Sequence, residues 1–140
     1  MAPPGESNIS ILLAKMQPSL DPTTYVFLTA KLPLHLLPLS TLQPQLIVPE
    51  EEGTTVVTTE ELATLHGFDE STFPCKKISL TIHSSLEAVG LIAAITNRLK
   101  DHDISTNVVS GYFHDHIYVP VARAKDAMRV LEELAAGARG

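Results

Sequence analysis

Two short stretches of the sequence combine residue types that could take part in chemistry. The first holds Ser84 and, three residues later, Glu87; the second is the triplet His114-Asp115-His116. Serine and glutamate at this spacing form a capping box, which satisfies two backbone N–H groups at a helix start. The N–H groups of a helix start carry partial positive charge and suit a carboxylate, while Asp115 would complement an ammonium group. If the two stretches face each other, they would bind both ends of an amino acid.

Both stretches also have simpler interpretations. Ser84 and Glu87 would cap their helix without any ligand, and Asp115 would only shape a turn. His114 and His116 would share one face of a strand, where paired imidazoles can bind zinc or copper. A third metal ligand would then have to come from His83, His102 or Asp115. Without cysteines or a helical His pair the metal signal is weak, and solvent-exposed histidines with no metal are the favoured interpretation.

Catalysis has less support in the sequence. There is no phosphate-binding glycine loop, no nucleophile elbow and no carboxylate pair at an evident spacing. Cys75 is the only cysteine and lies in a predicted linker over residues 69–75, with no base assigned to it. We therefore interpret Cys75 as structural or incidental, and we expect a protein that is not an enzyme and has no cofactor.

The elements around the two stretches follow from hydrophobic spacing. Residues 77–83 alternate between apolar and polar side chains, which predicts a half-buried strand. A helix is predicted to start at about Ser85 and to bury one apolar stripe, with Gly90 inside it at a cost of about 1 kcal/mol. Strands over 104–110 and 117–121 follow, and then a second amphipathic helix. The buried stripes of the two helices are Ala88, Leu91, Ile92, Ile95 and Leu99 in the first, and Ala124, Ala127, Met128, Leu131, Leu134 and Ala135 in the second.

The order βαββα predicts an α+β fold, a ferredoxin-like sandwich with two helices on one face of an antiparallel sheet. That fold needs a fourth strand after its second helix, and the sequence offers none there. We expect strands of the first half to complete this sheet or to form a second one beside it. The predicted organisation is a flexible tail over 1–8 and two halves, 9–70 and 76–136, that pack as one compact unit.

The first half contains several short elements. Apolar residues over 9–16 and 25–29 predict a hairpin, with a turn between Pro18 and Pro22. Strands over 46–48 and 54–58 flank an acidic turn at residues 50–52, which we interpret as a solvated hairpin tip. A short helix is then predicted, capped by Thr58 or Thr59 and ended by Gly67.

Composition limits the classes of partner. The chain of 140 residues is 44% hydrophobic and has a formal net charge of −6. Nucleic acids and anionic membranes are bound largely through concentrated Lys and Arg, so an acidic chain argues against both. No apolar run is long enough to cross a bilayer, and we expect a cytoplasmic protein. A small molecule or another protein is the expected partner.

Three stretches of the second half resemble a known family. They are Ser84-Ser-Leu-Glu-Ala-Val-Gly-Leu-Ile-Ala-Ala-Ile95, Ile104-Ser-Thr-Asn-Val-Val-Ser110 and Asp115-His-Ile-Tyr-Val-Pro120. Together they resemble the ACT domain, and more narrowly the small tandem-ACT proteins related to the cytosolic arginine sensors. The similarity covers about 75–134 closely and the first half more weakly. It implies a βαββαβ module that binds amino acids at interfaces between paired domains.

The resemblance also implies a site and a function. Residues 85–90 match the ligand-binding loop of the arginine sensors, and Asp115 with His116 matches their Asp-His pair. The implied ligand-binding residues are Ser84, Ser85, Leu86, Glu87, Val89, Gly90, Ser110, Asp115 and His116. Ala88 and the pair Gly111-Tyr112 depart from the sensors, so arginine itself is not implied. The implied function is an amino-acid-binding regulatory homodimer with a regulated partner protein; the alternative is an assembly module with no ligand.

Overall fold

The computed structural model describes residues 8–82 and 89–140. Contacts within the chain group into two compact units. Unit 1 comprises Met1–Pro22 and Lys76–Gly140, and unit 2 comprises Thr23–Cys75. Residues 9–22 therefore lie in the unit of the second half, although the sequence assigns them to the first.

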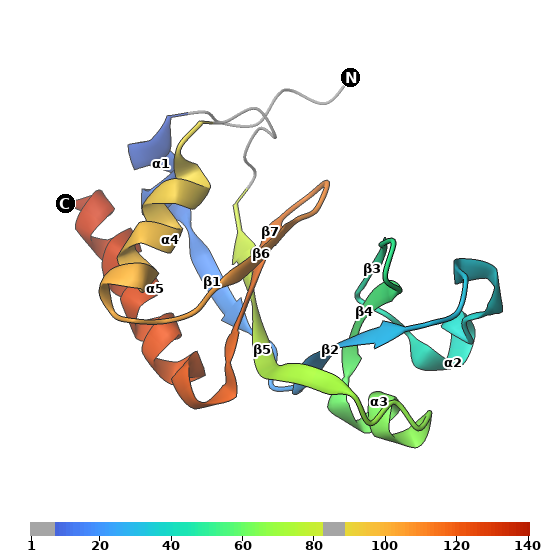
Figure 1. Ribbon diagram of the computed structural model, residues 1–140. Helices are drawn as coiled ribbons and strands as arrows, with labels where there is room; N and C mark the ends of the chain where they lie inside the picture. Colours follow the sequence, from blue (N-terminus) through green and yellow to red (C-terminus); the bar gives the residue numbers. More distant parts are fainter. Residues whose placement is uncertain (1–7, 83–88) are drawn as a thin grey trace. The chain divides into compact units, whose positions relative to one another are not determined.

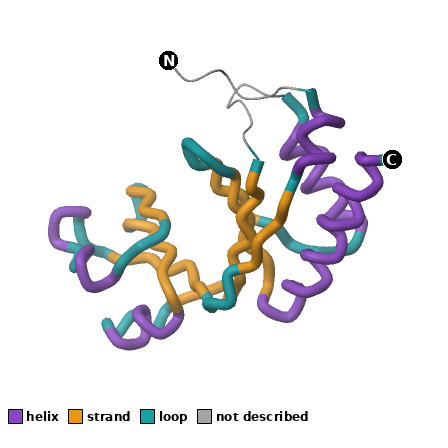
Figure 2. The backbone as a smooth tube through the Cα atoms, turned by 180° about the vertical axis from the view of Figure 1, so that it is seen from behind, coloured by secondary structure: helices purple, strands orange, loops and turns teal. Residues whose placement is uncertain are grey.

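Among the residues that the structure describes, unit 1 has a sheet of four strands. Its helices lie on one face of that sheet (Figures 1 and 2). Its strand order is β1-β5-β7-β6. The elements are α1 (Ile9–Lys15), β1 (Gln17–Leu20), β5 (Ser71–Thr81), α4 (Leu91–Asp101), β6 (Asn107–Ser110), β7 (Asp115–Pro120), the 3-10 turn η2 (Val121–Arg123) and α5 (Ala124–Arg139). The last half of β5 belongs to this unit and the first half to unit 2.

The core of unit 1 joins the helices to the inner face of the sheet. Ile78, Leu80 and Ile82 alternate along β5 and its end and are all buried, as the sequence predicts. They pack against the apolar sides of α1, α4 and α5 in one cluster. The predicted stripe of the last helix is also confirmed, since Ala124, Ala127, Leu131 and Ala135 are buried and Met128 and Leu134 are partly buried against the same cluster.

The missing fourth strand of unit 1 is β1. It pairs antiparallel with β5, with Pro18 opposite Leu80. With β1 counted as the fourth strand, the order becomes that of a ferredoxin-like sheet, which confirms both the α+β fold and the expectation that the first half completes this sheet. The predicted turn over residues 18–22 is wrong for residues 18–20. Pro18 lacks an N–H, but β1 lies at the sheet edge, where proline is tolerated.

The predicted strand over residues 9–16 is also wrong, because residues 9–15 form helix α1. Asn8 begins the helix, and its side chain accepts a hydrogen bond from the Ile11 N–H at 3.2 Å. Leu12 and Met16, four residues apart, are both buried on the side that faces the core. Leu, Ala, Lys and Met are strong helix formers, so local propensity and spacing agree with the helix.

Unit 2 has the same strand order on a smaller scale. Its sheet runs β3-β4-β2-β5, and a small buried cluster joins the sheet to two short helices. The elements are β2 (Tyr25–Ala30), the 3-10 turn η1 (Leu34–Leu36), α2 (Leu39–Leu42), β3 (Leu46–Pro49), β4 (Thr54–Thr59), α3 (Glu60–Leu65) and the first half of β5. The predicted hairpin of β3 and β4 is confirmed. The predicted cap of α3 is confirmed as well: the Thr59 hydroxyl accepts from the Leu62 N–H at 3.0 Å, and Gly67 follows with φ +76°.

Residues 69–75, predicted as a linker, mostly belong to β5. Ser71 and Thr72 pair with β2, and the register shifts before Cys75 pairs with Tyr25. Cys75 is fully buried, and its Sγ lies 3.4 Å from the Tyr25 carbonyl oxygen, to which it donates. Burial raises the pKa of the Cys75 thiol to about 12, so the reactive thiolate is disfavoured. This agrees with a structural cysteine.

Helix α4 begins later than the sequence predicts. Its first residue is Leu91 and its N-cap is Gly90, with φ +93°, a conformation that favours glycine. Gly90 is therefore a start residue and not an interior one. The predicted capping box of Ser84 and Glu87 lies outside the described residues, as do Ser85, Leu86 and Ala88. No described helix is long and apolar enough to span a membrane.

Candidate functional site

The predicted residues Ser110, Asp115 and His116 lie together at the β6–β7 hairpin of unit 1. Ser110 is the register partner of Asp115, and Val109 is that of His116. The Gly111 N–H donates to the His114 carbonyl oxygen at 2.9 Å and closes the turn. A Cβ on Gly111 would lie 3.0 Å from that oxygen, so the tight turn favours glycine. The hairpin thereby fixes Asp115 at the start of β7, where it is half-buried.

His116 connects the hairpin to the neighbouring strand. Its Nδ1 lies 2.8 Å from the Ser79 hydroxyl of β5, close enough for a hydrogen bond. Burial lowers the pKa of His116, and the nearby charges of Lys77 and His114 lower it further, whereas Asp115 acts in the opposite direction. The neutral form of His116 is therefore favoured, and its ring contacts the Ser79 hydroxyl.

His114 adds a second imidazole beside the same turn. Among the residues that the structure describes, its buried Nδ1 has no hydrogen-bond partner. His114 and His116 are both partly buried, which corrects the expectation of solvent-exposed histidines. Within residues 8–82 and 89–140, no group of three or more His, Cys, Asp or Glu side chains is arranged to hold a metal ion; His83 falls outside these ranges.

The other predicted site residues lie at the start of α4. Val89 is 87% exposed, and Gly90 has no side chain with which to cap the helix. Ser84, Ser85, Leu86 and Glu87 lie outside the described residues. Of the predicted site residues that the structure describes, Val89 and Gly90 lie at the start of α4, and Ser110, Asp115 and His116 lie at the β6–β7 hairpin (Figure 1). Their assignment to one site stays a prediction.

Sequence comparison identifies the family of both halves. A sequence model of the ACT domain matches residues 4–76, and a second ACT-domain model matches residues 71–133. The chain belongs to the ACT-domain family. It carries two ACT domains in tandem, as the sequence motifs indicate. No curated protein sequence matches the chain.

Solved structures share this fold over most of the ACT tandem. A Vibrio cholerae protein of unknown function, described as a possible transport protein, is 41% identical with a TM-score of 0.80, and the match covers 90% of this chain and 94% of that one. The regulatory subunit of aspartate kinase from Thermus thermophilus is 11% identical with a TM-score of 0.63, covering 86% and 96%. The corresponding subunit from Thermus flavus is 10% identical with a TM-score of 0.58, covering 84% and 95%. The latter two show likeness of fold alone.

Sequence reasoning missed one residue at the hairpin. The alternation of residues 77–83 predicts Ser79 on the polar face of its strand, but its contact with His116 depends on β5 and β7 being neighbours in the sheet. The same alternation places Ser79 on the same face as Lys77. Combined with the ferredoxin-like strand order, in which these two strands are neighbours, that alternation could have predicted the contact between Ser79 and His116.

Proposed function

We propose that this ACT-domain protein is a non-catalytic regulatory protein whose second ACT domain binds a small-molecule amino acid. The observation that carries the proposal is the half-buried Asp115, fixed by the hairpin beside His116, whose neutral form is favoured. A carboxylate in this setting suits the ammonium group of an amino acid. The start of α4, with glycine as its N-cap, suits the carboxylate.

The resemblance to ACT domains supports a homodimer. ACT domains, by the resemblance noted above, bind amino acids at interfaces between paired domains. We propose that the hairpin of one copy and the α4 start of another complete the site, with Ser84, Ser85, Leu86, Glu87, Val89 and Gly90 on one side and Ser110, Asp115 and His116 on the other. Ligand binding would then change the pairing and so signal to a regulated partner protein in the cytoplasm. The aspartate kinase structures bear names of regulatory subunits, in keeping with this role.

A thermal-shift screen of the intact protein against the twenty amino acids tests the proposal. A ligand that binds only the native state raises its stability, by about 2.7 kcal/mol at a hundredfold excess over Kd. We expect one or a few amino acids to raise the melting temperature. Asp115→Asn should reduce that shift, whereas Glu132→Gln, the same charge change at an exposed position of α5, should not.

The alternative function is an assembly module that dimerises without a ligand. The specific observation in its favour is that β6 lies at the edge of the unit 1 sheet, where another strand can pair. If no amino acid at millimolar concentration shifts the melting temperature, the sensor proposal is refuted. A dimer by light scattering in that same experiment would favour the assembly module.

A further inference from the structure

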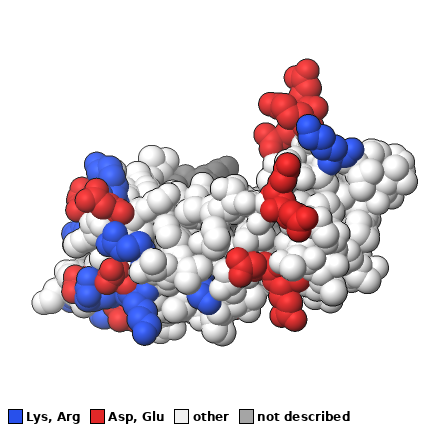
Figure 3. Space-filling view, turned by 60° about the horizontal axis from the view of Figure 1, so that its bottom comes forward, with Lys and Arg blue, Asp and Glu red and all other residues white. Residues whose placement is uncertain are grey.

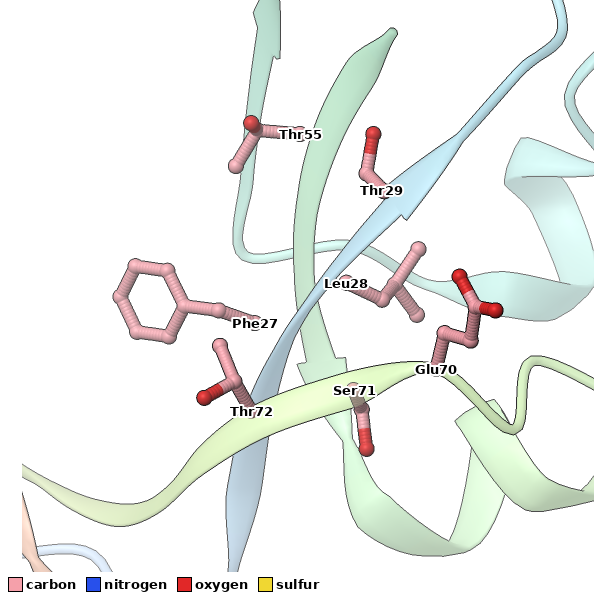
Figure 4. Close-up of a pocket in the computed structure, with 7 residues that line it drawn as sticks. All are labelled: Phe27, Leu28, Thr29, Thr55, Glu70, Ser71 and Thr72. Atoms are coloured by element: carbon pink, nitrogen blue, oxygen red, sulfur yellow. The ribbon is translucent and has the colours of Figure 1, made fainter.

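Unit 2 contains a pocket that is lined by none of the residues assigned to the proposed amino-acid site. Its volume is about 630 Å³, within the usual range for small-molecule sites. Three strands of the unit supply its walls, and Figure 4 shows the side chains around it. The lining residues used below are Phe27, Leu28, Thr29, Thr55, Glu70 and Thr72.

The pocket lies where the pairing of β2 with β5 is irregular. The register between these strands shifts between Tyr25 and Phe27, and Phe73 adopts a left-handed conformation with φ +57°. Such a bulge redirects side chains and commonly occurs beside functional sites. The Phe73 ring meets the Phe27 ring edge-on, with centroids 5.8 Å apart, and so holds Phe27 in place at one end of the pocket.

The chemistry of the lining is asymmetric. Phe27 lies at one end and Glu70 at the other, with Leu28 and Thr29 between them (Figure 4). Within the part of the chain that the structure describes, Glu70 has no ion-pair or hydrogen-bond partner, and none of the lining residues is basic. A ligand that fits would place an apolar body on Phe27 and a cationic group at Glu70.

The charge of unit 2 supports a cationic ligand. Residues 23–75 hold seven acidic residues and one lysine, a formal charge of −6 that equals the charge of the whole chain. Figure 3 shows acidic side chains gathered on the right of the view. A field of one sign raises the local concentration of oppositely charged ligands.

We infer that this pocket binds a small organic amine with an apolar or aromatic body and no carboxylate. An amino acid is disfavoured here because the lining offers no basic group for its carboxylate. This ligand class separates the pocket from the proposed site of unit 1, which needs both an ammonium and a carboxylate. The chain would then respond to two classes of metabolite, one through each ACT domain.

Amide NMR of the full chain, titrated with 2-phenylethylamine, tests the inference. We expect saturable shifts confined to amides of Phe27, Thr29, Thr55 and Thr72. Glu70→Gln should weaken binding about threefold to fivefold, as expected for one exposed ion pair. The matched control is Glu51→Gln, an equal charge change at the exposed β3–β4 turn, which should leave the affinity unchanged.

One further ligand and one further variant complete the test. 3-Phenylpropionate has the same apolar body with the opposite charge, and it should bind more weakly than the amine. Equal binding of both probes, or equal loss in the two glutamate variants, would overturn the inference. Asp115→Asn should leave amine binding unchanged, so failure here and failure of the proposed amino-acid site are distinguishable. Loss of amine binding in Asp115→Asn alone would place the amine in unit 1 and refute the assignment to unit 2.

Discussion

Unit 1 and unit 2 share one strand order but differ in helix length, core size and charge. The helices α4 and α5 of unit 1 have 11 and 16 residues, whereas α2 and α3 of unit 2 have four and six. Among the residues that the structure describes, the buried apolar clusters contain 17 and seven residues. Isolated helices of four to six residues are unstable, so unit 2 must depend more on its sheet and on specific polar contacts. Two units with the same strand order can therefore differ greatly in how much helix packing contributes to their stability.

Core truncation should give the largest difference between the units. Leu131→Ala removes a fully buried side chain from α5 and should cost about 3 kcal/mol of unfolding free energy. Leu42→Ala removes an equally buried leucine from the four-residue α2, where neighbouring turns can relax into the space, and should cost about 2 kcal/mol. Urea unfolding, followed by amide signals from each unit, measures both. A greater cost for Leu42→Ala would contradict the proposed difference in packing.

Removing a helix cap should cost less than truncating the core. Here the local loss of protection should be greater in unit 2 than in unit 1. Thr59→Ala removes the cap of α3, and Asn8→Ala removes that of α1; each should cost about 1 kcal/mol. We expect the greater loss of local protection in α3, because it is the shorter helix. Hydrogen exchange of the two helices provides the measurement. Thr64→Ala, at an exposed position within α3, is the control and should be neutral or slightly stabilising.

The smallest expected effect is the pH dependence that His116 gives to unit 1. Its folded pKa lies below its usual value near 6.5, so between these values the unfolded chain binds more protons than the folded one. Stability should therefore fall as the pH falls through this window and be recovered above it. His116→Asn should flatten the dependence of the urea midpoint on pH in unit 1 but not in unit 2. An unchanged slope would show that His116 is equally basic in both states.

The parts of the fold that local spacing determines were predictable. The alternation along β5 and the stripe of α5 follow directly from the order of apolar residues. The cap at Thr59 and the stop at Gly67 likewise depend only on neighbours within one helical turn. These elements are stable in the form that their own sequences favour.

The elements that depend on distant partners were not predictable in the same way. The apolar residues of α1 suit a strand or a helix by hydrophobicity alone, and that Leu12 and Met16 share one buried side is known only from the packed core. Pro18 indicates a turn locally, yet it lies in a strand because β5 supplies the pairing edge. The hairpin carrying Asp115 was placed correctly, but the pocket in unit 2 requires β5 to begin at Ser71, where the sequence indicates a linker.

The origin of β1 constrains the order in which the chain can fold during synthesis. All of unit 2 is made after β1 and before the segment of β5 with which β1 pairs. The ribosome therefore releases a strand whose partner does not yet exist, while residues 23–75 emerge as a contiguous block. Unit 2 can form early from nearby segments, but the sheet of unit 1 must wait for a pairing across more than fifty intervening residues. Until then the residues of β1 lack the strand with which they pair in the folded protein.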